Sequence, residues 1–81
     1  MYIVEDKKIA SIVGNNVKKA RKNYLNKPLT QAEVAEKTGI GCIAYQNIER
    51  GKNIPSVIRL LKIANFLNVS LDELLDGVKA R

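Results

Sequence analysis

Histidine and tryptophan are absent from this 81-residue sequence, and cysteine occurs once, as Cys42. The chain therefore lacks the commonest general base and the commonest metal ligand of proteins. A lone cysteine can form neither an internal disulfide nor a zinc site, which fits a reducing compartment. Because the sequence also has no Cys–His pair and no glycine-rich phosphate loop, we predict no enzyme, no metal site and no cofactor.

Aromatic residues and long apolar runs are also scarce. There are three tyrosines and one phenylalanine although 46% of the residues are hydrophobic, so we expect an aliphatic core. The best apolar run, VIRLLKIANFL, is broken by Arg59 and Lys62 and is shorter than the ~18 residues that a membrane helix needs. The opening MYIVEDKK has acids where a signal peptide has positive charge. We expect no membrane partner and a cytoplasmic location.

Acidic residues are missing from one long stretch. From Lys7 through Ala32 there are seven basic residues and no acid, whereas Asp72, Glu73 and Asp76 lie near the other end. The net charge is +6. A basic half predicts a polyanionic partner, with nucleic acid as the first candidate. A surface that is merely soluble is the simpler alternative, and charge alone does not decide between the two.

Helical patterns fill most of the chain. Apolar residues recur every three or four positions from Ile9 to Tyr24. Two capping boxes, Thr30-x-x-Glu33 and Ser70-x-x-Glu73, mark the starts of two further helices. With no clear strand pattern and no repeat, we predict one all-α domain over residues 1–81. Its five predicted helices, caps included, span Ile9 to Tyr24, Thr30 to Gly39, Cys42 to Arg50, Ser56 to Leu67, and Ser70 to Leu75.

Three separated motifs point to a known family. LTQAEVAEKTGI, YQNIERGKNIPS and LLKIANFLNVSLDELL follow one another with short joints. In this order and spacing they closely resemble the lambda-repressor-like helix-turn-helix domain of the Cro and XRE type, over roughly residues 12–76. The resemblance implies a compact five-helix DNA-binding domain. It implies a helix-turn-helix formed by the second and third helices, with the third lying in the major groove of double-stranded DNA.

The resemblance also assigns roles to single residues. It implies that Gln31, at the start of the second helix, touches phosphate and braces the third helix. It implies that Arg21 pairs with Glu49 inside the fold. The sequence departs from the family pattern in two places. The connector YLNKP is longer than usual, and the third helix opens with Gly41-Cys-Ile-Ala instead of a Ser or Thr cap and polar residues.

The third helix sorts into two stripes. Positions 41, 44, 45 and 48 share one stripe, which Tyr45 and Ile48 mark as the side that faces the core, and positions 42, 43, 46, 47 and 50 share the outer stripe. Gln and Asn can each make a bidentate contact with adenine, and an aliphatic side chain can touch a thymine methyl group. Glycine is an acceptable helix cap, so Gly41 is compatible with a helix start. The apolar opening, together with these amide side chains, is compatible with reading an A·T-rich site. Cys42 is interpreted as a bystander thiol and not as a redox sensor. Base contacts are predicted for Ile43, Gln46, Asn47, Cys42 and Arg50.

Phosphate contacts are predicted for residues at helix starts and loops that flank the third helix, because proteins usually hold the DNA backbone from such places. Loop lysines are often only solvated, so the group is a firmer prediction than any member. The group comprises Lys27, Thr30, Gln31, Lys52 and Asn53.

An apolar cluster ends the chain. In the family such a segment often supports a twofold dimer, which would bind paired half-sites. Closing the core is the alternative role. We predict a homodimer whose interface contains Val69, Leu71, Leu74 and Leu75.

Two functions from different classes follow. The first is a sequence-specific transcriptional regulator, a repressor or control protein that binds a palindromic operator as a dimer. The alternative is a protein-binding module on the same fold, an antagonist or antitoxin whose third helix packs on a protein partner. The exposed positions of Cys42 and Ile43 are the features that favour this alternative.

Overall fold

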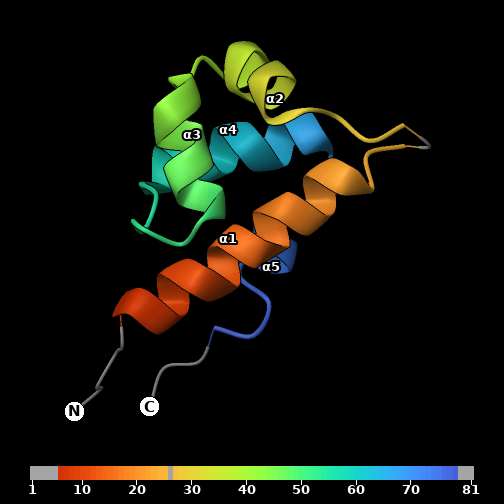
Figure 1. Ribbon diagram of the computed structural model, residues 1–81. Helices are drawn as coiled ribbons and strands as arrows, with labels where there is room; N and C mark the ends of the chain where they lie inside the picture. Colours follow the sequence, from red (N-terminus) through yellow and green to blue (C-terminus); the bar gives the residue numbers. More distant parts are fainter. Residues whose placement is uncertain (1–5, 26, 79–81) are drawn as a thin grey trace.

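The computed structural model describes residues 6–25 and 27–78 (Figure 1). These residues contain helices and no strand, which confirms the predicted all-α class. None of these helices is long and apolar enough to span a bilayer. The helices are α1 (Asp6–Lys22), α2 (Gln31–Thr38), α3 (Cys42–Glu49), α4 (Val57–Leu67) and α5 (Leu71–Leu74).

Most helix ends follow the cap chemistry of the sequence. At α2 the Thr30 hydroxyl accepts the backbone N–H of Glu33 at 3.1 Å, and the Glu33 carboxylate accepts the N–H of Thr30 at 3.0 Å. Ser56 and Ser70 accept N–H groups in the first turns of α4 and α5. Gly39 ends α2 with φ 72°, a left-handed conformation in which glycine carries no steric penalty.

Helix α1 begins and ends earlier than the predicted Ile9 to Tyr24. It ends at Lys22, so Tyr24 lies beyond the helix, where its ring stacks on that of Phe66 with centroids 5.8 Å apart. The apolar spacing of three to four residues continues past the end of the helix because the Tyr24 side chain packs against the core although its backbone is not helical. Helix α3 likewise ends at Glu49, one residue before the predicted Arg50, which caps it.

A glycine sets how closely α3 lies against α1. A Cβ atom added to Gly14 would overlap the carbonyl oxygen of Ile48 and lie 2.8 Å from that of Glu49. Only a residue without a side chain therefore allows the last turn of α3 to rest on the α1 backbone. Around this crossing the core consists of aliphatic residues and one tyrosine, chiefly Val13, Val17, Val34, Tyr45, Ile48, Leu60, Ile63, Leu67 and Leu74.

The position of Leu74 corrects one prediction. Leu74 is 1% exposed and belongs to the core, so it is not available as a surface residue of a dimer interface. Asn16 on α1 fixes this segment, because its side-chain amide donates to the carbonyl oxygens of Leu74 at 2.9 Å and Asp76 at 2.8 Å. Val69, Leu71 and Leu75 are half-buried against the core.

Candidate nucleic-acid interface

The turn between α2 and α3 is held by short-range contacts. The Thr38 hydroxyl donates to the carbonyl oxygen of Val34 at 2.7 Å, and Ile40 is buried. Gly39 in its left-handed conformation reverses the chain. The hydroxyl bond closes the last turn of α2, and the reversal at Gly39 and the burial of Ile40 set how α3 follows it. Two helices joined by so short a turn form a helix-turn-helix.

A buried ion pair joins α1 to the end of α3. The Arg21 Nε donates to Glu49 Oε2 at 2.7 Å, and its Nη2 donates to Glu49 Oε1 at 3.0 Å. Arg21 Nη1 also donates to the carbonyl oxygen of Leu29 at 2.7 Å. Such a two-pronged contact fixes the carboxylate in orientation as well as in position.

Two more side chains complete the network. The Tyr45 hydroxyl donates to Glu49 Oε2 at 2.5 Å, and Gln31 Nε2 donates to Glu49 Oε1 at 2.9 Å. Burial alone would raise the pKa of Glu49, but hydrogen bonds from Arg21, Tyr45 and Gln31 outweigh it and hold the pKa below its ordinary value. Glu49 therefore stays ionised, and α1, α2 and α3 meet on one carboxylate. The bracing role expected of Gln31 has a direct structural basis in this contact.

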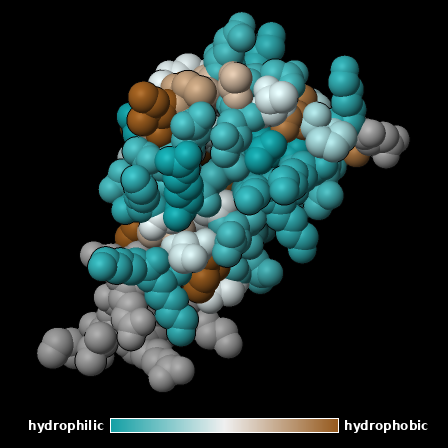
Figure 2. Space-filling model, viewed as in Figure 1, coloured by the Kyte–Doolittle hydropathy of each residue, from teal (hydrophilic) through white to brown (hydrophobic). Residues whose placement is uncertain are grey.

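The outer face of α3 is free of such contacts. Cys42 and Ile43 are exposed, Ile43 to 74%, and Arg50 just after the helix is exposed as well. Gln46 and Asn47 are half-buried on the same side, and the Gln46 amide lies 3.7 Å from the Cys42 sulfur. The five residues predicted to contact bases thus share one side of α3. Figure 2 shows hydrophobic patches near the top of a mainly hydrophilic face.

The start of α3 carries no side-chain cap, and sterics do not impose this. Gly41 is the N-cap residue with φ −56°, and no atom lies within 4 Å of a Cβ placed there. A serine or threonine could therefore occupy position 41 and accept an N–H of the first turn. The unusual opening of α3 is a property of its sequence and not a demand of the fold.

Along the chain, the predicted phosphate contacts flank the helix pair α2 and α3. Lys27 and Thr30 are exposed ahead of α2, whereas Lys52 and Asn53 are exposed in the loop that follows α3. Gln31 is half-buried, because one of its amide N–H groups is already donated to Glu49. This hydrogen bond sets the orientation of the Gln31 amide, and therefore the direction in which its second N–H and its carbonyl oxygen can contact a ligand.

A shallow hollow beside α3 contains residues that the sequence did not single out. Ile43 and Asn47 on α3 face Ile54 and Arg59 across it. Ile54 is 47% exposed, and Arg59 is exposed in the first turn of α4. The Ser56 cap located the start of α4 correctly, but nothing in the sequence placed that turn against α3. The one available signal was Arg59 itself, because a cation is unfavourable in the first turn of a helix, where acids are favoured, and such a residue can serve a ligand instead.

Comparisons with known proteins agree on the fold. The helix-turn-helix family model matches residues 17–74, which is more than half of the chain. The HTH-type transcriptional regulator YqaE of Bacillus subtilis is 47% identical over 62 residues, covering 76% of this chain and 51% of YqaE. The cryptic phage CTXphi transcriptional repressor RstR of Vibrio cholerae is 42% identical over 45 residues, covering 56% of this chain and 40% of RstR. The chain spans about half the length of the curated relatives it matches.

Solved structures give the same result. The N-terminal DNA-binding domain of SinR from Bacillus subtilis superposes with a TM-score of 0.73 at 32% identity, covering 83% of this chain and 94% of that domain. The P22 c2 repressor in complex with a synthetic operator has a TM-score of 0.66 at 29% identity, covering 80% and 94%. These likenesses confirm the lambda-repressor-like arrangement of the five helices.

Proposed function

The chain belongs to the helix-turn-helix family, and we propose that it is a sequence-specific regulator that binds double-stranded DNA with α3 in the major groove. One observation carries this proposal. The inner side of α3 is held in place by the Glu49 carboxylate, which accepts four hydrogen bonds. The outer side of α3 presents five side chains that take no part in this network. A rigid helix with a free outer face is what direct readout of base edges requires.

The outer face of α3 suits an A·T-rich site. Gln46 and Asn47 supply amide groups that can pair with adenine, and Ile43 supplies an aliphatic surface for a thymine methyl group. Arg50 and Cys42 border these residues at the two ends of the face. Lys27, Thr30, Gln31, Lys52 and Asn53 would hold the phosphates on either side and so set the register.

The family relationship favours this function over the protein-binding alternative. YqaE and RstR carry the names of transcriptional regulators, and RstR that of a repressor. We therefore propose repression or control of transcription. A duplex-DNA partner agrees with the cytoplasmic location expected from the sequence.

We further propose that the protein acts as a homodimer on a palindromic site. Leu74 is excluded from the interface because it lies in the core. Val69, Leu71 and Leu75 remain candidates because they are only half-buried. A twofold axis near α5 would set two copies of α3 on half-sites about one helical turn of DNA apart. Analytical ultracentrifugation of Leu71→Asp against wild type tests this assignment, since a variant that stays folded and dimeric places the interface elsewhere.

Selection of binding sites from random duplex DNA is the decisive experiment. We expect an enriched A·T-rich palindrome, whereas no enrichment would reject sequence-specific binding. Replacing individual thymines of the selected site with uracil then tests Ile43, because uracil lacks the methyl group. The replacement should weaken wild-type binding and leave Ile43→Ala unaffected. Equal loss in both proteins would show that Ile43 does not read a methyl group.

A further inference from the structure

The outer face of α1 is a charged surface that has no part in the DNA contacts proposed above. Five lysines on this helix are exposed, and no acidic residue occurs from Lys7 through Ala32. Figure 2 shows hydrophilic side chains spread over α1. A surface of one sign and of this length attracts a polyanion. The five residues are Lys7, Lys8, Lys18, Lys19 and Lys22.

The five lysines form two rows on the helix. At about 100° per residue, Lys7, Lys18 and Lys22 lie within about 60° of one another. Lys8 and Lys19 lie further round the same helix, each about 100° beyond Lys7 or Lys18. The first row runs from residue 7 to residue 22, and fifteen steps of about 1.5 Å make it about 22 Å long.

The first row adjoins the proposed DNA interface. Ser11 lies within this row and is exposed. A Cβ atom on Gly51 would lie 2.8 Å from the Ser11 Cα, so the loop that follows α3 rests directly on α1 at this point. Arg50 and Lys52, on either side of Gly51, are exposed. The exposed cations Arg50 and Lys52 therefore lie next to the part of α1 between Lys7 and Lys18.

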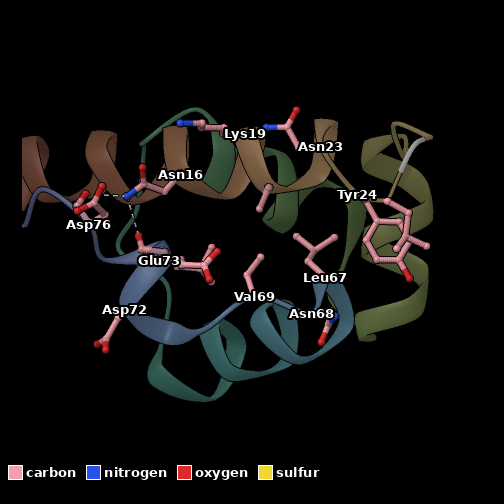
Figure 3. A pocket seen from close by; sticks show the side chains of 13 residues that line it. Asn16, Lys19, Asn23, Tyr24, Leu67, Asn68, Val69, Asp72, Glu73 and Asp76 are labelled. Atoms are coloured by element: carbon pink, nitrogen blue, oxygen red, sulfur yellow. Dashed lines mark hydrogen bonds between the residues drawn. The ribbon is translucent and has the colours of Figure 1, made fainter.

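The second row differs from the first in the surroundings of Lys19. Lys19 lines the groove between α1 and α5, and Asp72, Glu73 and Asp76 line its other side (Figure 3). Glu73 points into the groove and Asp72 points away from it (Figure 3), so Glu73 is the acid that most directly opposes the approach of a polyanion from that direction. The two rows thus carry the same side chains on the same helix but differ in their surroundings.

We propose that Lys7, Lys18 and Lys22 contact the phosphates of the bound duplex beyond the base pairs that α3 reads. The inference rests on the proposed function. Because the loop after α3 contacts α1 within this row, a duplex bound by α3 is the DNA nearest to the three lysines. Duplex DNA carries one negative charge per about 1.7 Å of its axis, so a row about 22 Å long meets many phosphates. The contact adds affinity and footprint without adding sequence preference.

A matched pair of double variants tests the proposal. Lys7→Gln with Lys18→Gln and Lys8→Gln with Lys19→Gln each remove two charges from α1 at the same spacing. Both are titrated against the selected duplex, once trimmed to the selected base pairs and once extended by about ten base pairs, one helical turn, on each side. On the extended duplex the first variant should lower the log–log salt slope by about 1.8, at about 0.9 for each phosphate contact. The second variant should match wild type on both duplexes.

Three results would overturn the proposal. Equal losses in both double variants would indicate a general charge effect, and no loss in either would indicate a solvated face. A loss that persists on the trimmed duplex, together with capture of a second labelled duplex by wild type, would assign the row to another DNA molecule. Failure of the proposed function is distinct from all three, because then wild type selects no sequence at all. Far-UV circular dichroism melts of both variants confirm that each remains folded.

Discussion

Replacing Glu49 with alanine should destabilise the whole domain. The carboxylate accepts four hydrogen bonds, two from Arg21 and one each from Tyr45 and Gln31. Its removal leaves the Arg21 guanidinium, whose side chain is only 11% exposed, without an anionic partner. Breaking a buried pair in this way costs about 3–5 kcal/mol. Because small domains have about 5–15 kcal/mol in total, Glu49→Ala should lose a large part of its free energy of unfolding.

Urea denaturation followed by far-UV circular dichroism measures this loss. Glu36→Ala is the matched control, since Glu36 is an exposed acid on α2 and surface substitutions usually stay within about 0.5 kcal/mol. A Glu49→Ala variant that unfolds within about 0.5 kcal/mol of this control would refute the reasoning. It would mean that the pair contributes nothing in solution.

A double substitution separates the charge from the hydrogen bonds. Arg21→Met combined with Glu49→Leu removes both charges while keeping similar volumes, and such replacements are often neutral or stabilising. The double variant should therefore be more stable than Glu49→Ala. If it is equally unstable, the Tyr45 and Gln31 hydrogen bonds carry the stabilisation, and not the relief of an unpaired cation.

Four further outcomes are expected. The pKa of Glu49 lies below its ordinary value, so its contribution to stability is present above the unfolded pKa of about 4.3 and is lost as pH falls through the lower folded pKa; acid titration of Glu49→Gln should lack that component. Gly14→Ala should lower the free energy of unfolding by about 1–3 kcal/mol, because the methyl group overlaps α3 carbonyl oxygens, and a melt unchanged from wild type would disprove the close crossing. Gly41→Ser should raise stability by a few tenths of a kcal/mol by adding a cap, which a lower melting temperature would contradict. Asn47→Ala should lose about 1–3 kcal/mol on the selected duplex and relax preference at one base pair, while Lys52→Ala should weaken all sequences by similar factors; identical profiles for the two variants would remove the distinction.

Helix positions were largely readable from the sequence because caps are local. The capping boxes at Thr30 and Ser70 and the stop at Gly39 each involve residues within one turn, and the structure places helix ends there. The end of α1 was misjudged because Tyr24 continues the apolar spacing while its backbone has left the helix. Periodicity reports which side chains are buried, and only indirectly which backbone is helical.

Tertiary contacts were less accessible. The Arg21–Glu49 pair came from family resemblance, because spacing alone did not distinguish a buried pair from two surface charges. The hydroxyl of Tyr45 joins that pair, but its partner could not be named before the distance between α1 and α3 was known. Leu74 could not be told from the half-buried Leu71 and Leu75, because a one-turn helix is too short for its pattern to identify which leucine faces inward.

We propose that the apolar opening of α3 serves a contact outside the molecule. The space around Gly41 would accept a larger cap, and Ile43 is mostly exposed, so neither residue is required by the core. Because Ile43 is exposed on a helix that Glu49 holds in place, its side chain can contribute through contact with a bound partner and not through the core. Beside it, Asn47, Ile54 and Arg59 line one hollow that combines an amide, an aliphatic surface and a cation. These are the three side-chain chemistries that meet adenine, a thymine methyl group and a phosphate, respectively.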